Sequence, residues 1–151
     1  MRNLLRFALA LALLTGGCAA PAQPSTTTQP NAAVTRPAQL DTSTTQMSQV
    51  GSYRIRLTPD QEPVTISTLQ TWTVHVETAD GQAVTGATVS VDGGMPEHNH
   101  GLPTKPLVTA GADGDYGVEG IKFQMPGWWT ITVTVEEGGR RDSATFNLLL
   151  N

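Results

Sequence analysis

Two histidines and a methionine stand close together in residues 93–103, a stretch rich in Gly, Pro and Asn. Met95 precedes His98 by three residues, and His100 follows His98 by two. In an extended chain, the spacing of the two histidines would point both imidazoles to the same side. A second Met-Pro pair begins at Met125. Imidazole and thioether donors therefore converge on this part of the chain.

Imidazole and thioether groups together form a ligand set for copper, because soft sulfur favours Cu(I) and imidazole binds either oxidation state. We therefore predict a copper site with Met95, His98 and His100 as ligands and Met125 as a fourth. Zinc fits less well, since its structural sites use Cys, His and carboxylates. The residues alone leave three interpretations open. They are copper, another metal, and a loop at the domain edge in which the methionines only fill gaps in the core.

The elements that must position this stretch are predicted to be strands. Apolar and polar residues alternate in five runs, at residues 53–57, 72–77, 87–91, 129–136 and 143–150. Such alternation indicates strands with one wet and one buried face. Two shorter strands near 107–109 and 116–124 bring the number to about seven, which is typical of an immunoglobulin-like sandwich. We predict an all-β domain over residues 51–151, with Trp72, Trp129, Phe146 and β-branched residues in its core.

Turn residues separate several of these runs. Asp80-Gly81 stands between the second and third runs, and Gly138-Gly139 between the last two, so we predict a tight hairpin at each. The segment from Asp113 to Tyr116 resembles the tyrosine corner of immunoglobulin-like folds. There the tyrosine hydroxyl braces the loop that it follows.

The N-terminus predicts export. Arg2 and Arg6 flank the start of an apolar run at residues 7–14, which is too short to span a bilayer and is typical of a signal peptide. Small residues then lead to Cys18, the one cysteine of the chain. We predict a signal peptide over residues 1–17 and lipid modification of Cys18, although Thr15 stands where a lipobox usually has Leu. Cleavage after Ala20 and a free thiol are the alternatives.

Residues 18–50 are rich in Pro, Thr, Ser and Gln, which predicts a disordered linker. A flexible chain of about 30 residues has an r.m.s. span of about 30 Å. The linker would tether the domain to the cell-envelope membrane. Ala19 after the cysteine favours the outer membrane, with the domain facing the periplasm.

The charge balance excludes one class of partner. The chain has 9 Lys and Arg against 13 Asp and Glu, and loss of Arg2 and Arg6 with the signal peptide makes it more acidic. Nucleic-acid binding needs a basic patch to neutralise phosphates, and the sequence contains none. No nucleophile elbow or glycine-rich phosphate loop is recognisable, so we expect no enzymatic activity.

Three stretches resemble the YtkA-like domain family. They are residues 80–84 (DGQAV), 95–101 (MPEHNHG) and 123–129 (FQMPGWW). The family is related to the FixH proteins, which are encoded with cytochrome oxidase assembly genes. The resemblance implies a small β-sandwich of the cell envelope that is linked to copper handling. It also implies that Met95, His98 and His100 form the site-bearing loop, whereas Gly127-Trp128 resembles an element of the fold.

Two functional hypotheses follow. The first is a copper-binding accessory or chaperone protein that serves an envelope oxidase or another copper-handling protein. The second is a non-catalytic module that binds a protein partner in the envelope without a metal. Its motivation is the tether, because a lipid anchor and a flexible spacer raise the effective concentration near membrane-bound partners.

Overall fold

The computed structural model describes residues 34–151, which form nine β-strands and no helix. The strands are β1 (Thr45–Met47), β2 (Tyr53–Pro59), β3 (Gln70–Thr78), β4 (Thr88–Met95), β5 (His100–Gly101), β6 (Leu107–Ala110), β7 (Asp115–Ile121), β8 (Gly127–Glu137) and β9 (Arg140–Leu150). No helix able to cross a membrane occurs within these residues. The predicted signal peptide, Cys18 and the first part of the predicted linker lie outside them.

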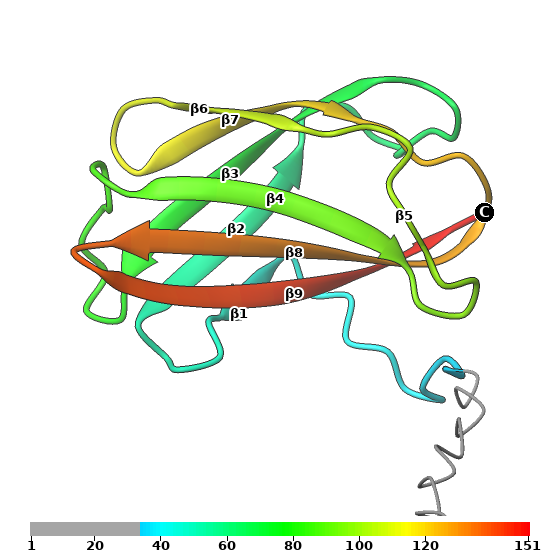
Figure 1. Cartoon of the computed structure of the whole chain (residues 1–151), viewed down its shortest axis with the longest axis horizontal. Coiled ribbons are helices and arrows are strands. Elements are labelled where there is room, and N and C mark those ends of the chain that lie inside the picture. Colours follow the sequence, from blue (N-terminus) through cyan, green and yellow to red (C-terminus); the bar gives the residue numbers. More distant parts are fainter. Residues whose placement is uncertain (1–33) are drawn as a thin grey trace, which may run out of the picture. The chain divides into compact units, whose positions relative to one another are not determined.

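The strands form two antiparallel sheets that face each other (Figure 1). One sheet has the order β1-β2-β3-β7-β6, and the other has the order β5-β4-β8-β9. The prediction of an all-β sandwich is confirmed. The two strands that alternation could least reveal are β1 and β5, because they contain three and two residues.

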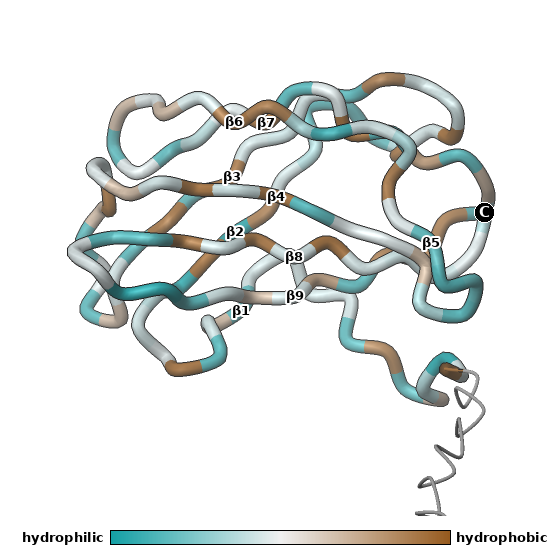
Figure 2. Tube along the Cα trace, in the orientation of Figure 1, coloured by the Kyte–Doolittle hydropathy of each residue, from teal (hydrophilic) through white to brown (hydrophobic). Residues whose placement is uncertain are grey.

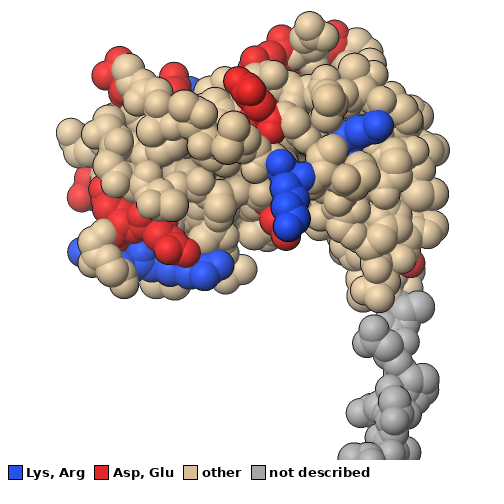
Figure 3. Space-filling view, turned by 45° about the horizontal axis from the view of Figure 1, so that its top comes forward, with Lys and Arg blue, Asp and Glu red and all other residues tan. Residues whose placement is uncertain are grey.

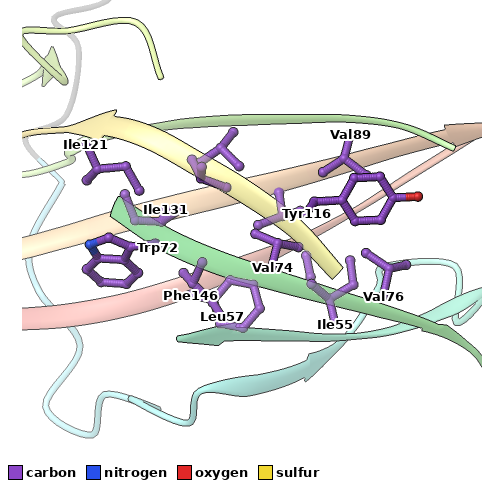
Figure 4. Packing of buried hydrophobic residues seen from close by; sticks show 14 of the residues in the cluster. Ile55, Leu57, Trp72, Val74, Val76, Val89, Tyr116, Ile121, Ile131 and Phe146 are labelled. Carbon is purple, nitrogen blue, oxygen red and sulfur yellow. The ribbon is translucent and has the colours of Figure 1, made fainter. Parts of the chain in front are cut away.

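The core lies between the sheets, where the inward side chains of alternating positions meet (Figure 4). Apolar and polar residues alternate along several strands (Figure 2). The predicted core residues Trp72, Trp129 and Phe146 are all buried. Phe123 joins the two tryptophans, with ring centroids 6.1 Å from Trp72 and 5.2 Å from Trp129. Met95 is also among the large side chains that are fully buried. The aromatic part of the core thus extends toward the stretch that contains the histidines.

One of the two predicted hairpins is confirmed. Gly138 and Gly139 both have positive φ and connect β8 to β9, as Glu137 pairs with Arg140. The hairpin predicted at Asp80-Gly81 is wrong, because β3 and β4 belong to different sheets. The turn there joins Glu77 to Ala83 by a single bridge, and the chain then crosses to the other sheet.

The tyrosine-corner interpretation also needs correction. The hydroxyl of the buried Tyr116 donates a hydrogen bond to the carbonyl of Val84 at 2.8 Å, not to the loop before the tyrosine. Val84 lies in the connection that crosses from β3 to β4. Tyr116 therefore fixes the path of the chain between the sheets, and burial raises its pKa.

The predicted linker extends too far toward the C-terminus. Residues 45–47 form β1 and pair with β2, and Ser48 is buried. The carboxylate of Asp142 accepts hydrogen bonds from the backbone N–H groups of Val50 at 3.1 Å and Ser52 at 3.2 Å. These partners are about 90 residues apart in sequence. Composition alone could not reveal that this part of the linker is ordered.

Candidate functional site

The two neighbouring histidines lie on the hairpin that joins β4 to β5. Met95 ends β4 and pairs with His100, the first residue of β5. The amide of His98 donates to the carbonyl of Met95 at 3.1 Å, which closes a turn over Pro96. Asn99 then adopts the left-handed conformation, with φ of 53°. Proline presets φ at the second position of such turns and asparagine tolerates the left-handed region, so the sequence suits the turn.

Two glycines allow the hairpin to fold back closely on β4. A Cβ atom at Gly94 would lie 2.6 Å from the carbonyl oxygen of His100. A Cβ atom at Gly93 would lie 2.6 Å from the carbonyl oxygen of Thr130 on β8. The amide of Leu102 donates to the carbonyl of Gly93 at 2.9 Å. A side chain at Gly94 would therefore displace the strand that begins with His100, and one at Gly93 would press on β8.

The imidazoles of His98 and His100 lie near each other, with ring centroids 6.0 Å apart and planes inclined by 29°. The extended chain assumed from their spacing is wrong, because Asn99 is left-handed. The turn brings the rings together instead. His98 is exposed and His100 is half-buried, so at least one ring faces solvent directly.

His100 is held by its neighbour Gly101 and by two residues of the stretch 123–129. Its ring meets Trp129 edge-on, with centroids 5.5 Å apart and an interplanar angle of 67°. Its Nδ1 lies 3.1 Å from the carbonyl oxygen of Gly101 and 3.2 Å from Nε2 of Gln124. Neither Trp129 nor Gln124 was predicted as part of the site. The FQMPGWW stretch contains both residues, but only the fold places them beside a histidine.

Met95 is a core residue, with 1% of its surface exposed. Its Cε atom occupies the space beside Gly127, where a Cβ atom would lie 2.7 Å away. Gly127 has φ of +128°, so both its conformation and its lack of a side chain are required. Met95 and His100 also line one open hollow of about 300 Å³ at the hairpin. The thioether is thus shielded from bulk solvent, on a residue whose backbone pairs with His100.

Met125 lies on the connection between β7 and β8 and is half-buried against the core. Its carbonyl accepts a hydrogen bond from Nε1 of Trp129 at 3.0 Å. Trp129 therefore contacts both His100 and the backbone of Met125. The structure brings the two Met-Pro segments to the same end of the sandwich, as the sequence interpretation requires.

The two imidazoles meet the distance requirement for sharing one metal ion. A metal–imidazole bond is about 2 Å long and the ring radius adds about 1 Å, so two ring centroids on one ion lie at most about 6 Å apart. The observed 6.0 Å is at this limit. If Nδ1 of His100 donates its hydrogen to the Gly101 carbonyl, Nε2 carries the free lone pair. Ligating histidines commonly have such a carbonyl partner.

Within residues 34–151, no three His, Cys, Asp or Glu side chains lie together in a way that could hold a metal ion. The predicted donor set is of a different kind, because it combines two imidazoles with two thioethers. The residues present thus fit copper, for which thioethers are suitable ligands, better than zinc.

The third histidine has different surroundings. Nδ1 of His75 lies 2.6 Å from Oδ1 of Asp115, and its Nε2 lies 3.2 Å from Oε1 of Glu77. The side chain of His75 is only 20% exposed to solvent, although it lies on the outer face of β3. Both ring nitrogens have carboxylate partners, and Glu77 also lies 3.6 Å from Arg54.

The N-terminal segment of the domain passes beside the histidine hairpin (Figure 1). The amide of Arg36 donates to Oε1 of Glu97 at 3.3 Å, and Glu97 adjoins His98 in the turn. Further along, the carbonyl of Asp41 accepts from Nδ2 of Asn147 at 2.8 Å. The chain that comes from Cys18 therefore joins the domain next to the candidate site.

Charged side chains of both signs are interspersed on the face shown in Figure 3. Lys and Arg do not gather there into a basic patch. This distribution agrees with the acidic balance of the sequence.

Comparisons with known proteins identify the domain. The model of the family described as YtkA-like matches residues 47–134. One similar solved structure is that of a DUF4426 family protein from Pseudomonas aeruginosa, with a TM-score of 0.51 and 12% identity. The match covers 71% of this chain and 94% of that chain, and it supports the fold alone. No curated protein sequence matches the chain.

Proposed function

The chain belongs to the YtkA-like family, and from this premise we propose that its domain binds copper at the β4–β5 hairpin as an accessory or chaperone protein of the cell envelope. The observation that carries the proposal is the pair of imidazoles of His98 and His100. Their centroid distance of 6.0 Å is at the upper limit for two ligands of one ion. Copper is the cargo of such a protein and not a catalytic cofactor.

The methionines complete the proposed donor set. Met95 lies across the hairpin from His100, and Met125 lies on the neighbouring connection. Thioethers stabilise Cu(I) and do not oxidise to disulfides as thiols do, which suits a site outside the cytoplasm. A site with an exposed imidazole at His98, and half-buried or buried donors at the other three positions, can receive copper at His98 and release it by the same path.

The test is a titration with Cu(I) against a competing chelator. The chain carries Cys18→Ser, so that a thiol cannot bind the metal. We expect one Cu(I) per chain, and a loss of at least a hundredfold in affinity for His98→Ala/His100→Ala. The matched control is His75→Ala, which removes a histidine from β3 and leaves the hairpin intact. Equal affinity of the double variant and the wild type would overturn the assignment.

We also propose that the mature chain begins at a lipid-modified Cys18 and is anchored to the envelope membrane. Supporting this is the sequence pattern at residues 1–18. Radiolabelled palmitate should enter the wild type and not Cys18→Ser, and the variant should leave the membrane fraction. A soluble wild type that begins after Ala20 would contradict the proposal.

A membrane-bound partner that takes up copper, such as an envelope oxidase or another copper-handling protein, fits this arrangement. The competing function is a protein-binding module without a metal. One observation favours it: Leu107 is 65% exposed on β6, an edge strand with a free side. Cross-linking in the envelope distinguishes the two functions. A partner that is lost with Leu107→Asp and retained without the two histidines would support the module.

A further inference from the structure

Nδ1 of His100 faces two partners with opposite requirements. The Gly101 carbonyl at 3.1 Å can only accept a hydrogen bond, so it requires a hydrogen on Nδ1. Nε2 of Gln124 at 3.2 Å is an amide nitrogen that donates, so it requires a lone pair on Nδ1. A neutral imidazole has one protonated and one unprotonated nitrogen. The two hydrogen bonds therefore belong to different tautomers of the same ring.

The tautomer decides which nitrogen is available to a ligand. When Nδ1–H donates to Gly101, the lone pair is on Nε2, which points away from both partners. When Gln124 donates to Nδ1, the hydrogen of the neutral ring is on Nε2. The lone pair of Nδ1 is then used by the hydrogen bond from Gln124, and no other ring nitrogen has a free lone pair. The first state can bind a metal through Nε2, and the second state cannot.

The neighbours of His100 restrict movement of its ring, so that Nδ1 stays near both partners. Trp129 is fully buried and meets His100 edge-on at 5.5 Å, which limits rotation of the imidazole. The backbone of β5 also lies close against β4, since a Cβ atom at Gly94 would be only 2.6 Å from the carbonyl oxygen of His100. Gln124, by contrast, is exposed and lies on the β7–β8 connection, so its amide can leave Nδ1 without disturbing the core.

We propose that Gln124 is a positioning residue that controls the tautomer of His100 and thereby regulates loading of the site. Its amide holds the ring in the state that does not bind, and its departure releases Nε2. The tautomer control rests on the two contacts of Nδ1, whereas its effect on copper rests on the proposed function. The apparent affinity of a site falls by the fraction of molecules in the competent state.

The first experiment measures the tautomer without metal. Nitrogen chemical shifts of the neutral His100 ring in the Cys18→Ser chain identify the protonated nitrogen. We expect a large share of the Nε2–H tautomer in this parent chain, and a shift toward Nδ1–H when Gln124→Leu is added. The control is Gln82→Leu, which replaces an exposed glutamine in the turn after β3. It should leave the tautomer populations of His100 unchanged. Identical tautomer populations with and without Gln124→Leu would overturn the proposal.

A second variant tests the direction of the hydrogen bond. The carboxylate of Gln124→Glu can only accept, so it should favour Nδ1–H as Gln124→Leu does, and more strongly. If the amide of Gln124 were turned over and accepted from Nδ1–H, Gln124→Leu would instead increase the Nε2–H tautomer. That result would also overturn the proposal.

The Cu(I) titration separates this inference from the proposed function. We expect Gln124→Leu to bind Cu(I) about three- to tenfold more tightly, the range that one hydrogen bond can shift. If Gln124→Leu changes the tautomer but no variant binds Cu(I), the proposed function fails and the tautomer control stands. If the parent chain binds Cu(I), and Gln124→Leu changes neither the affinity nor the tautomer, the tautomer control fails and the copper site stands.

Discussion

The two ends of the sandwich treat histidine in different ways. Toward the end with the β8–β9 turn, charged side chains serve as hydrogen-bond partners. His75, for example, lies between Asp115 and Glu77. At the end with the β4–β5 turn, His100 has a carbonyl, an amide and an indole edge as neighbours. We call these the charged end and the histidine end. Thr78 at the end of β3 shares a surface hollow with Glu137 and Gly138, which places β3's last residues at the charged end.

The difference shows what makes a histidine available. His75 has an anionic partner at each ring nitrogen, so a metal ion would have to displace a carboxylate. His100 has uncharged partners at Nδ1 and a shielded thioether across the hairpin. The charged end thus offers His75 anionic partners, whereas the histidine end offers His100 uncharged ones. The following predictions test this comparison.

Gly127→Ala should have the largest effect and should damage the histidine end. The added Cβ would lie 2.7 Å from Cε of Met95, and φ of +128° strains any side chain. Overpacking together with backbone strain should cost about 3 kcal/mol of unfolding free energy, measured by urea denaturation. Gly138→Ala also has positive φ but nothing within 4 Å, so it should cost about 1 kcal/mol. Equal costs would show that Met95 does not fill this space tightly.

Asp142→Asn should have the next largest effect, at the charged end. Burial raises the pKa of Asp142, but hydrogen bonds from Ser48, Val50, Ser143 and Ser52 outweigh it and lower the pKa from 3.8 to about 2. The ionised carboxylate therefore stabilises the fold by about 2 kcal/mol at neutral pH.

Because the folded pKa is depressed, this stabilisation is present above 3.8 and is lost as the pH falls toward about 2. The difference in unfolding free energy between wild type and Asp142→Asn should therefore shrink over this window. The exposed Asp80→Asn is the control and should cost little at any pH. A difference that does not change with pH would show that the hydrogen bonds of Asp142 do not depend on its charge.

Both ends were partly predictable from the sequence, for local reasons. Alternation located β2, β3, β8 and β9, because each strand has one buried and one wet face. The Gly138-Gly139 turn could be predicted because glycine tolerates positive φ, which both residues adopt. These features depend on residues within a few positions of one another.

The remainder depends on contacts between residues far apart in sequence. Tyr116 bonds Val84 across 32 positions, and Gln124 reaches His100 across 24. The amides of Val50 and Ser52 bond Asp142, about 90 positions away. The geometry of the two histidines depends on one left-handed residue, Asn99, which their spacing could not reveal. No local pattern encodes such partners.

Trp129→Phe should have an intermediate effect on stability and a specific effect on the histidine end. Phenylalanine cannot donate to the Met125 carbonyl and fills less of the core, so we expect a loss of about 1.5 kcal/mol. It should also weaken Cu(I) binding severalfold, because His100 loses its edge contact. Trp128→Phe, which loses a similar bond to Asn147, is the matched control. Trp128→Phe should lower the free energy of unfolding and keep the Cu(I) affinity of the wild type. A loss of both would show that removing either tryptophan disturbs the site.

His75→Gln should have the smallest effect, and it addresses the comparison most directly. His75 and its two partners lie partly in solvent, with Asp115 53% exposed, and ion pairs of this kind contribute little. We expect a loss of about 0.5 kcal/mol in urea denaturation, since glutamine can still donate to one carboxylate. Cu(I) affinity should not change, because the carboxylates at the charged end already occupy both nitrogens of His75. If instead Cu(I) affinity fell as far as in His100→Gln, a histidine enclosed by carboxylates would be as available to the metal as one beside a carbonyl and an amide, and the distinction between the two ends would fail.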